Sequence, residues 1–315
     1  MRFEVTTLGT GAALPARGRF PSAQLINIHE RLHLVDCGEG TQERLRQAEV
    51  NFNRIGTVFI SHMHGDHYLG LMGLLSSMHL NGRLSGLNVY GPPELREVID
   101  VQLRASQTYL RYPLKVYALA HESGVCVYAD PYVEVITLKL KHRIPTTGFL
   151  FREKQPPRRL RKERLLDIPH FARNAVKNGD DLTLADGTVI PNHELTLDPP
   201  APRRYAYCSD TAFAPELVEH IQGVDLLYHE ATFTEELADR AKETCHSTAK
   251  QAATLAKAAN VGTLLLGHFS SRYKDNRVLL AEALPIFPNT LLADEGRVFT
   301  VDQRTVVENS DARVT

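Results

Sequence analysis

The stretch Ser61-His62-Met63-His64-Gly65-Asp66-His67 decides the fold, because it gathers three imidazoles and a carboxylate into one short segment. It follows the apolar run 57–60, which predicts a strand that ends where the polar segment begins. Imidazole nitrogens and carboxylate oxygens are ligands that suit zinc. One loop of this spacing can therefore serve two adjacent metal positions. The alternative is a polar loop that is rich in histidine by chance in a chain with 14 histidines, and the fixed H-x-H-x-D-H order disfavours it.

Length and composition predict a soluble globular protein. The chain has 315 residues, 43% of them hydrophobic, which is enough for one large domain with room for an insertion. No stretch approaches the roughly 20 apolar residues that a membrane-spanning helix needs. The first residues, Met1-Arg2-Phe3-Glu4-Val5, lack the apolar segment of a signal peptide. We therefore expect a cytoplasmic protein without a membrane partner.

Cysteine content and net charge argue against a disulfide-stabilised protein and against a protein that is basic overall. The chain has four cysteines and no C-x-x-C pair, so we expect neither disulfides nor a zinc knuckle. We expect the four side chains to be reduced: Cys37, Cys126, Cys208 and Cys245. The formal net charge of −1 gives no overall attraction to nucleic acid. Any polyanion must therefore bind to a local basic patch, and we expect no DNA partner.

The segment before the polar loop predicts strands at 3–8, 22–28 and 31–35, and a helix at 41–48. The loop 15–21 carries Arg17 and Arg19 and is a candidate substrate edge. Asp36 ends the third strand and is expected beneath the metal loop. A carboxylate there can orient a ligating histidine through its second ring nitrogen, although a capping or turn role is the alternative.

The segment after the loop predicts helices at 68–80 and 93–106 and strands at 87–90, 114–118 and 133–141, which together complete a first αβ half. The last of these strands leads to His142. A lone histidine at a strand end is usually an unremarkable core or surface residue. The context of the metal loop favours a ligand here.

Residues 152–204 differ in composition from the rest of the chain. The segment from 152 to 164 carries seven cations against two acids: Arg152, Lys154, Arg158, Arg159, Arg161, Lys162 and Arg164. Prolines interrupt the segment, and a hairpin is expected at 180–190 around Asp186-Gly187. We interpret 152–204 as an inserted arm. A solvated charged linker between two half-domains is the alternative, because charge runs are usually solvated.

The second half repeats the pattern of strands that end at polar residues. Strands at 205–209, 225–228 and 263–267 deliver Asp210, His229-Glu230 and His268, respectively. Thr248 and Gln251 are spaced as a capping box before an alanine-rich helix. The helix start is therefore expected to fix the loop that holds His246.

These residues resemble the metallo-β-lactamase superfamily, whose α/β fold is a four-layer αβ/βα sandwich with a metal cleft at the sheet edge. The resemblance implies two Zn²⁺ per chain with seven ligands: His62, His64 and His142 on one ion, Asp66, His67 and His268 on the other, and Asp210 between both. Two metals roughly 3.5–4 Å apart activate a water and stabilise charge during displacement at phosphorus. The expected reaction is hydrolysis of a phosphodiester.

The motifs are most similar to those of the ribonuclease Z family, over nearly the whole chain. They are the opening at 9–11, the segment 36–42, the His-Glu-Ala-Thr tetrad at 229–232, the His-Ser-Thr triplet at 246–248 and the segment 267–273. The resemblance implies a homodimeric endoribonuclease that removes the 3′ trailer from precursor tRNA, cutting downstream of the discriminator and leaving a 3′-hydroxyl. Asp66 would act as general base, and His246, oriented by Glu230, would donate a proton to the leaving oxygen.

The arm fits the same resemblance, because family members carry a tRNA-binding exosite inserted before the bridging aspartate. Candidate RNA contacts are the basic side chains Arg158, Arg159, Arg161, Lys162 and Arg164, together with Arg17 and Arg19. The tip departs from the family pattern, since 168–174 replaces Gly-Pro repeats. The domain organisation predicted is a single domain, 1–315, with the arm at 152–204 inserted in it.

Competing functions use the same fold. A small-molecule phosphodiesterase would share all the zinc ligands, but it would not need the basic arm. An inert RNA-binding scaffold would typically lose ligands, whereas this chain keeps all seven. Thiol-dependent or lactone hydrolysis is a further possibility, since fold alone does not fix function.

Overall fold

Strand β14 (Arg204–Cys208) shows how the chain builds its layers in the computed structural model, which describes residues 2–302. Tyr205 and Tyr207 lie in an apolar cluster to which both large sheets contribute. Ala206 and Cys208, which point the other way, lie in a cluster shared with helices. Because side chains alternate along a strand, one face of β14 packs against the other sheet and the opposite face against helices.

Within residues 2–302, the first sheet has seven strands in the order β18-β1-β2-β3-β4-β5-β6. Its strands are β1 (Phe3–Gly9), β2 (Ala23–Ile28), β3 (Arg31–Val35), β4 (Ile55–Phe59), β5 (Leu87–Gly91), β6 (Leu114–Ala118) and β18 (Val298–Thr300). The accompanying helices are α1 (Thr41–Gln47), the 3₁₀ turn η1 (Phe52–Arg54), α2 (Gly65–Tyr68), α3 (Leu71–Leu80) and α4 (Glu94–Ala105).

The second sheet also has seven strands among the described residues, in the order β17-β16-β15-β14-β9-β8-β7. Besides β14 its strands are β7 (Cys126–Ala129), β8 (Val133–Leu140), β9 (Thr146–Glu153), β15 (Leu226–Glu230), β16 (Thr263–Gly267) and β17 (Thr290–Leu292). Its helices are α7 (Leu217–His220), the 3₁₀ turn η4 (Glu235–Leu237), α8 (Ala238–Thr244), α9 (Ala249–Ala258) and α10 (Arg277–Ala283).

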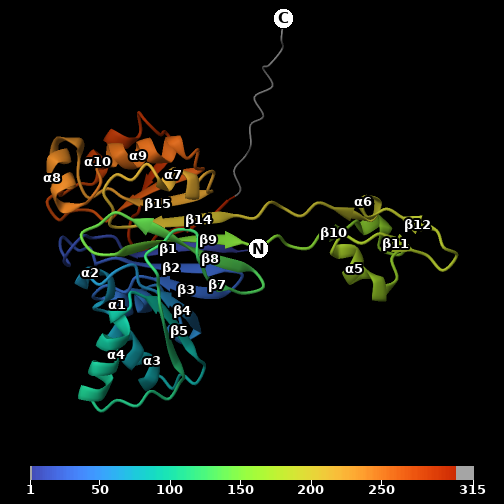
Figure 1. Cartoon of the computed structure of the whole chain (residues 1–315), viewed down its shortest axis with the longest axis horizontal. Coiled ribbons are helices and arrows are strands. Elements are labelled where there is room, and N and C mark those ends of the chain that lie inside the picture. The colour runs from blue at the N-terminus through green and yellow to red at the C-terminus, as the bar shows by residue number, and fades with distance from the viewer. Residues whose placement is uncertain (1, 303–315) are drawn as a thin grey trace, which may run out of the picture. The chain divides into compact units, whose positions relative to one another are not determined.

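The two sheets and their helices form four layers (Figure 1). Residues such as Phe3, Phe59 and Phe149 fill the space between the sheets. Leu45 and Leu74, from α1 and α3, pack on the outer face of the first sheet. Helices α7, α9 and α10 pack on the outer face of the second sheet. The predicted four-layer αβ/βα class is confirmed.

The chain divides into two compact units, and the smaller one comprises Glu153–Pro202. It contains two short antiparallel pairs, β10 (Arg159–Leu160) with β13 (Thr196–Leu197) and β11 (Leu182–Thr183) with β12 (Val189–Ile190). Its helical turns are η2 (Lys162–Arg164), η3 (His170–Ala172), α5 (Arg173–Lys177) and α6 (Asn192–Leu195). The expected hairpin at 180–190 is the β11–β12 pair. The unit has its own small core: Ile168, Ala172, Val176, Leu182 and Leu195.

Two element predictions were wrong. The strand at 133–141 does not complete the first half, because β8 lies in the second sheet between β7 and β9. The sequence analysis omitted β9, which pairs antiparallel with β14 and buries Phe149 and Phe151 between the sheets. The helix expected at 68–80 is interrupted between α2 and α3, where Gly70 passes close to another segment. A Cβ at Gly70 would lie 2.1 Å from the carbonyl oxygen of Gly38, so this crossing requires glycine.

Parallel strands place several chain segments at one edge of the fold. Strand β3 is parallel to β4 in the first sheet, and β14, β15 and β16 are parallel to one another in the second. The carboxyl ends of neighbouring parallel strands meet at the same edge of a sheet. Asp210, Glu230 and His268 lie at or just after such ends. Among residues 2–302 we find no helix that is long and apolar enough to cross a membrane.

Candidate metal centre

The candidate metal loop, residues 61–67, begins just after β4, and Asp36 restrains it through hydrogen bonds. Asp36 is fully buried and accepts hydrogen bonds from the Ser61 amide at 2.8 Å and from the Ser61 hydroxyl at 3.0 Å. Its Oδ2 also lies 2.7 Å from Nδ1 of His67 and accepts a 2.7 Å hydrogen bond from the Tyr207 hydroxyl. The expected contact between Asp36 and a histidine of the loop is therefore present. Tyr207, on the second sheet, is a partner that the sequence analysis missed.

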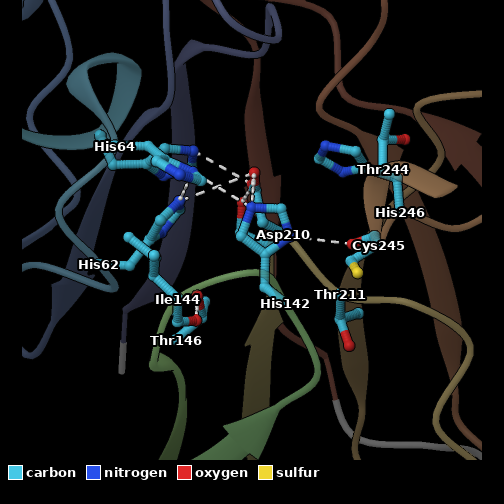
Figure 2. A network of polar contacts seen from close by, with 12 residues as sticks. His62, His64, His142, Ile144, Thr146, Asp210, Thr211, Thr244, Cys245 and His246 are labelled. Atoms are coloured by element: carbon cyan, nitrogen blue, oxygen red, sulfur yellow. Dashed lines mark hydrogen bonds and ion pairs between the residues drawn. The ribbon is translucent and has the colours of Figure 1, made fainter.

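A first group of ligand atoms converges at one side of Asp210 (Figure 2). His64 Nδ1 lies 3.0 Å from His62 Nε2 and 3.1 Å from His142 Nε2. Oδ2 of Asp210 lies 3.7 Å from His62 Nε2 and 3.6 Å from His142 Nε2. The structure therefore brings these four predicted residues together from two sheets.

A second group converges on the other carboxylate oxygen of Asp210. Oδ1 of Asp210 lies 3.1 Å from His67 Nε2 and 3.1 Å from His268 Nε2. Oδ2 of Asp66 lies 3.6 Å from His67 Nε2 and 3.5 Å from His268 Nε2. Asp210 is thus placed between the groups, with one oxygen facing each of them.

Hydrogen bonds at the far side of four rings direct the Nε2 atoms inward. The Nδ1 atoms have partners outside the two groups: Ser61 Oγ at 2.9 Å for His62, Asp36 for His67, the Cys245 carbonyl at 2.9 Å for His142 and Thr232 Oγ1 at 3.0 Å for His268. A ring whose Nδ1–H is donated presents an unprotonated Nε2. That tautomer is the one a metal ligand needs.

Two features of these residues fit bound metal ions. Nε2 of His67 and Nε2 of His268 are buried and have no hydrogen-bond partner among residues 2–302, although each lies 3.1 Å from Oδ1 of Asp210. Four N and O ligands at about 2.0–2.1 Å around a tetrahedral zinc lie roughly 3.3 Å apart, which matches the separations in both groups.

Charge and burial set the protonation of these ligands. Burial raises the pKa of Asp66 and Asp210, but neighbouring histidines outweigh it and lower the pKa of both carboxylates below the usual range. Burial lowers the pKa of His62 well below its ordinary value. Burial also acts on His67, but Asp210, Asp36 and Asp66 outweigh it and raise the pKa of this ring. A cation bound there would displace a proton from His67.

His246 lies beside the two groups, next to Glu230. Its Nδ1 is 2.8 Å from Oε1 of the fully buried Glu230, as the sequence analysis expected. Burial lowers the pKa of His246, but the Glu230 charge and hydrogen bond raise it to about 9. Glu230 is fixed in turn by the amides of Thr211 and Ser247 at 2.7 and 3.0 Å. The Glu230 contact therefore favours the protonated ring, which could donate a proton from Nε2.

Four non-glycine residues at the site have positive φ angles. Asp36, Cys245 and His268 have φ angles of 56°, 56° and 55°, in the left-handed region that non-glycine residues rarely adopt. Ala13, whose amide donates a 2.7 Å hydrogen bond to Oδ2 of Asp66, has a φ of 68°. Strained residues persist where surrounding contacts hold them, which is typical of functional sites.

A cleft of about 300 Å³ opens onto both groups. It is lined by Ala12, Ala13, Pro15, Pro21, Glu39, His64, Gly65, Asp66, Leu69, Arg143, Asp210, His246 and His268. Arg143 is a functional candidate that the sequence analysis missed, although its position directly after His142 could have indicated it. It is exposed and has no hydrogen bond or ion pair within residues 2–302.

Arg17 and Arg19 are not among the residues that line the cleft. Nε of Arg17 donates to the Ser271 carbonyl at 2.5 Å. Arg19 donates to Asn276 Oδ1 at 2.9 Å and lies over the Phe269 ring. Both side chains thus fasten their loop to the segment after β16, and RNA contacts by them stay a prediction.

The candidate RNA contacts of the smaller unit are partly neutralised. Arg158, Arg161 and Arg164 form ion pairs with Asp198, Glu163 and Asp167, at 2.5, 3.8 and 2.8 Å. Arg159 and Lys162 have no ion pair among the described residues. Residues 153–202 contain eight Lys or Arg and eight Asp or Glu, so the unit is neutral overall. The cationic residues are concentrated in its first half.

Comparison with known proteins identifies the family. The chain is 47% identical to a ribonuclease Z of Phocaeicola vulgatus over 296 residues, which cover 93% of this chain and 96% of the relative. The chain belongs to the ribonuclease Z family. It is 44% identical to the ribonuclease Z of Bacteroides thetaiotaomicron, over 98% of this chain and 99% of that one. As a member of this family, it is an endoribonuclease that requires a metal.

Solved structures agree with the ribonuclease Z family. Human tRNase Z, short form, superposes with a TM-score of 0.69 at 27% identity, over 95% of this chain and 99% of that one. The metallo-beta-lactamase fold protein YhfI from Bacillus subtilis has a TM-score of 0.67 at 20% identity, over 95% and 100%, which supports the fold alone. The profile of a further family, described as the anti-Pycsar protein Apyc1, matches residues 3–123.

Proposed function

We propose that this chain removes the 3′ trailer from precursor tRNA by hydrolysing the phosphodiester downstream of the discriminator, leaving a 3′-hydroxyl on the tRNA. The observation that carries the proposal is the position of Asp210. Its two oxygens face two groups of histidines, and the Glu230–His246 pair borders the same cleft. The ribonuclease Z relatives and the human tRNase Z support the choice of RNA.

The residues that would hold two zinc ions are the two groups described above. His62, His64 and His142 would hold one, Asp66, His67 and His268 the other, and Asp210 would contact both. Five imidazoles and two carboxylates suit zinc better than the all-oxygen set that magnesium prefers. When bound, two such ions supply Lewis acidity, which promotes the ionisation of water and offsets negative charge at phosphorus.

The side chains supply the proton transfers. Asp66 is ionised, lies 10% exposed at the cleft and is fixed by the Ala13 amide, so its carboxylate can accept the proton of the attacking water. His246 is protonated and held by Glu230, so its free Nε2–H can be donated to the leaving oxygen of the trailer. Exposed Arg143 at the cleft can pair with a phosphate oxygen.

Substrate binding, assembly and location complete the proposal. The smaller unit, Glu153–Pro202, would be the exosite arm that contacts the tRNA body through phosphates. Arg159 and Lys162 are the candidate contacts that have no ion pair to break among the described residues. The active form would be a homodimer, which rests on the family resemblance, and the compartment would be the cytoplasm. Sedimentation that shows a fully active monomer would contradict the dimer.

Incubation with a precursor tRNA that carries a 3′ trailer tests the function directly. We expect one cut after the discriminator, a product with a 3′-hydroxyl, and loss of the cut after metal removal. A small phosphodiester, bis(p-nitrophenyl) phosphate, is the comparison substrate. Hydrolysis of this compound without any cut in precursor tRNA would favour a small-molecule phosphodiesterase instead.

A further inference from the structure

Thr232 touches both parts of the proposed machinery. It lies two residues after the end of β15 and is 3% exposed. Its hydroxyl oxygen is 2.6 Å from Oε2 of Glu230 and 3.0 Å from Nδ1 of His268. It also lies 3.0 Å from the carbonyl oxygen of His268 and 3.5 Å from Nδ1 of His246. A side chain that only filled space would not need a polar atom at this point.

Counting hydrogens assigns the direction of the contacts with Glu230 and with Nδ1 of His268. The hydroxyl has one hydrogen and two lone pairs. The 2.6 Å contact with an ionised carboxylate has the length of a charge-assisted bond, so the hydroxyl donates to Glu230. A lone pair is then left for His268, whose Nδ1 must carry the hydrogen. Nε2 of His268, which is buried without a hydrogen-bond partner, is consequently unprotonated.

We propose that Thr232 is a positioning residue that fixes the tautomer of His268 for the second metal position and at the same time restrains Glu230 behind His246. The inference rests on the proposed function, since it assumes that His268 is a metal ligand. The outer partner of His142, the Cys245 carbonyl, by contrast restrains one ring only. Thr232 therefore couples the metal centre to the proton donor.

Loss of the Thr232 hydroxyl should affect His268 and Glu230 to different extents. Glu230 keeps four other donors when the hydroxyl is removed: the amides of Thr211, Ser247 and Thr232 and the His246 ring. For Nδ1 of His268, Thr232 is the side-chain acceptor found among the described residues. Loss of the hydroxyl should therefore weaken the second metal position more than it disturbs His246. Removal of an outer partner of a metal ligand typically lowers metal affinity about 10–100-fold.

Two substitutions separate the hydroxyl from the methyl group. Thr232→Val keeps the shape and removes the hydroxyl, and Thr232→Ser keeps the hydroxyl and removes the methyl. The matched control is Thr234→Val, because Thr234 is 8% exposed and its hydroxyl contacts Tyr273 outside the site. Zinc affinity is measured on the purified full-length chain by competition with a chromophoric chelator, and circular dichroism monitors folding.

We expect the wild type, Thr232→Ser and Thr234→Val to bind two zinc ions with affinities within about threefold of one another. Thr232→Val should retain the first ion and bind the second about 10–100-fold more weakly. Equal second-site affinities of Thr232→Val and the wild type would overturn the proposal. A loss of second-site zinc affinity in Thr232→Ser as large as that in Thr232→Val would also overturn it. If the valine variant does not fold, the serine variant decides, because a second-site affinity outside the expected threefold range would overturn the proposal.

The same titration separates this inference from the proposed function. A wild-type chain that binds no second zinc ion would contradict the two-metal centre itself. A wild type that binds two ions, with no difference between the valine and serine variants, would leave the centre intact and reject the role of Thr232.

Discussion

The Asp210 carboxylate and the His67 ring lie 3.1 Å apart without forming a hydrogen bond. Both are buried, and within the described part of the chain Nε2 of His67 has no hydrogen-bond partner. A buried polar atom without a partner usually costs about 1–3 kcal/mol, so such an atom calls for an explanation. A shared cation at this position would satisfy both groups.

The first prediction concerns Asp210. Asp210→Ala removes the carboxylate that faces both groups, so elemental analysis should find two zinc ions per wild-type chain and fewer than one per variant chain. The control is Glu216→Ala, which removes an exposed ion pair with Lys141. Full metal content and full activity in Asp210→Ala would contradict the assignment of the centre.

The second prediction separates chemistry from binding. His246→Ala and Asp66→Ala should each slow single-turnover cleavage of precursor tRNA by about 10²–10⁴, the usual range for loss of a general acid or base. RNA affinity should change little, since most of the contacts with RNA are expected from the cations of the smaller unit and not from these two side chains. Cleavage by His246→Ala at the wild-type rate would show that the ring is structural at the start of α9.

The third prediction concerns Arg143, whose charge is exposed at the cleft. Arg143→Gln should weaken transition-state or substrate binding about 10–100-fold, because a charge-assisted contact with phosphate is worth roughly 1.5–3 kcal/mol. Zinc content should be unchanged. The control is Arg96→Gln, which removes an exposed ion pair on α4. If both variants cleave precursor tRNA like the wild type, Arg143 does not contact substrate.

The fourth prediction concerns the smaller unit. Replacing residues 154–202 with a short Gly-Ser linker should leave all seven candidate ligands in place. Arg203 is best retained, since it donates to the Val301 carbonyl and lies over the Phe3 ring. Hydrolysis of bis(p-nitrophenyl) phosphate should survive, while precursor tRNA cleavage should fall through loss of affinity. Equal loss of both activities would mean that the unit is needed for folding.

Removing two charges of the smaller unit, without deleting the unit, tests whether these cations bind RNA. Arg159→Gln combined with Lys162→Gln should lower the salt dependence of RNA binding by about one to two in log–log slope, because each phosphate contact contributes about 0.7–0.9. Arg158→Gln is the comparison, since its side chain is already paired with Asp198. An unchanged slope in the double variant would place the RNA contacts elsewhere, for instance in the loop of Arg17.

The fifth prediction concerns stability against pH. His33 is buried among aromatic rings, with Nδ1 2.6 Å from Thr57 Oγ1, and burial lowers its pKa from 6.5 to about 4. As the pH falls from 6.5 to 4, the unfolded chain takes up this proton before the folded chain does. The folded state therefore loses stability over that range, by on the order of 3 kcal/mol.

Urea unfolding of chelator-treated protein at pH 7 and at pH 4.5 measures this effect. His33→Asn should be less stable than the wild type at pH 7, because it loses packing, and its free energy of unfolding should fall less on acidification. Parallel curves for the two proteins would show that His33 takes up its proton over the same pH range in the folded and the unfolded chain, so that folding does not lower its pKa.

Local features of the chain were predictable because they depend on neighbours in sequence. The spacing from His62 to His67 is set within one loop, and the capping box of Thr248 and Gln251 lies within one helical turn and is present as predicted. The strand ends that carry Asp210 and His268 were also found, since buried parallel strands appear as apolar runs that stop at a polar residue.

Tertiary structure decided which of these residues meet and what holds them. Strand β8 lies in the second sheet because β9, which the hydrophobic pattern did not reveal, pairs with β14 there. The same packing brings the Tyr207 hydroxyl to Asp36, 171 positions away in sequence. Likewise, the ion pair between Arg158 and Asp198 reduces a charge that the sequence alone presents as free.

The sequence by itself therefore determined the ligand types and the strand ends, because both are encoded in short segments. Packing of the two sheets decided which groups contact the Nδ1 atoms of the histidine rings and which histidines each oxygen of Asp210 faces. It also placed Thr232 between His268 and Glu230. These contacts join residues from separate strands. Spacing within a segment carries no information about such distances, since they arise only when buried side chains fill the space between the sheets and at their shared edge.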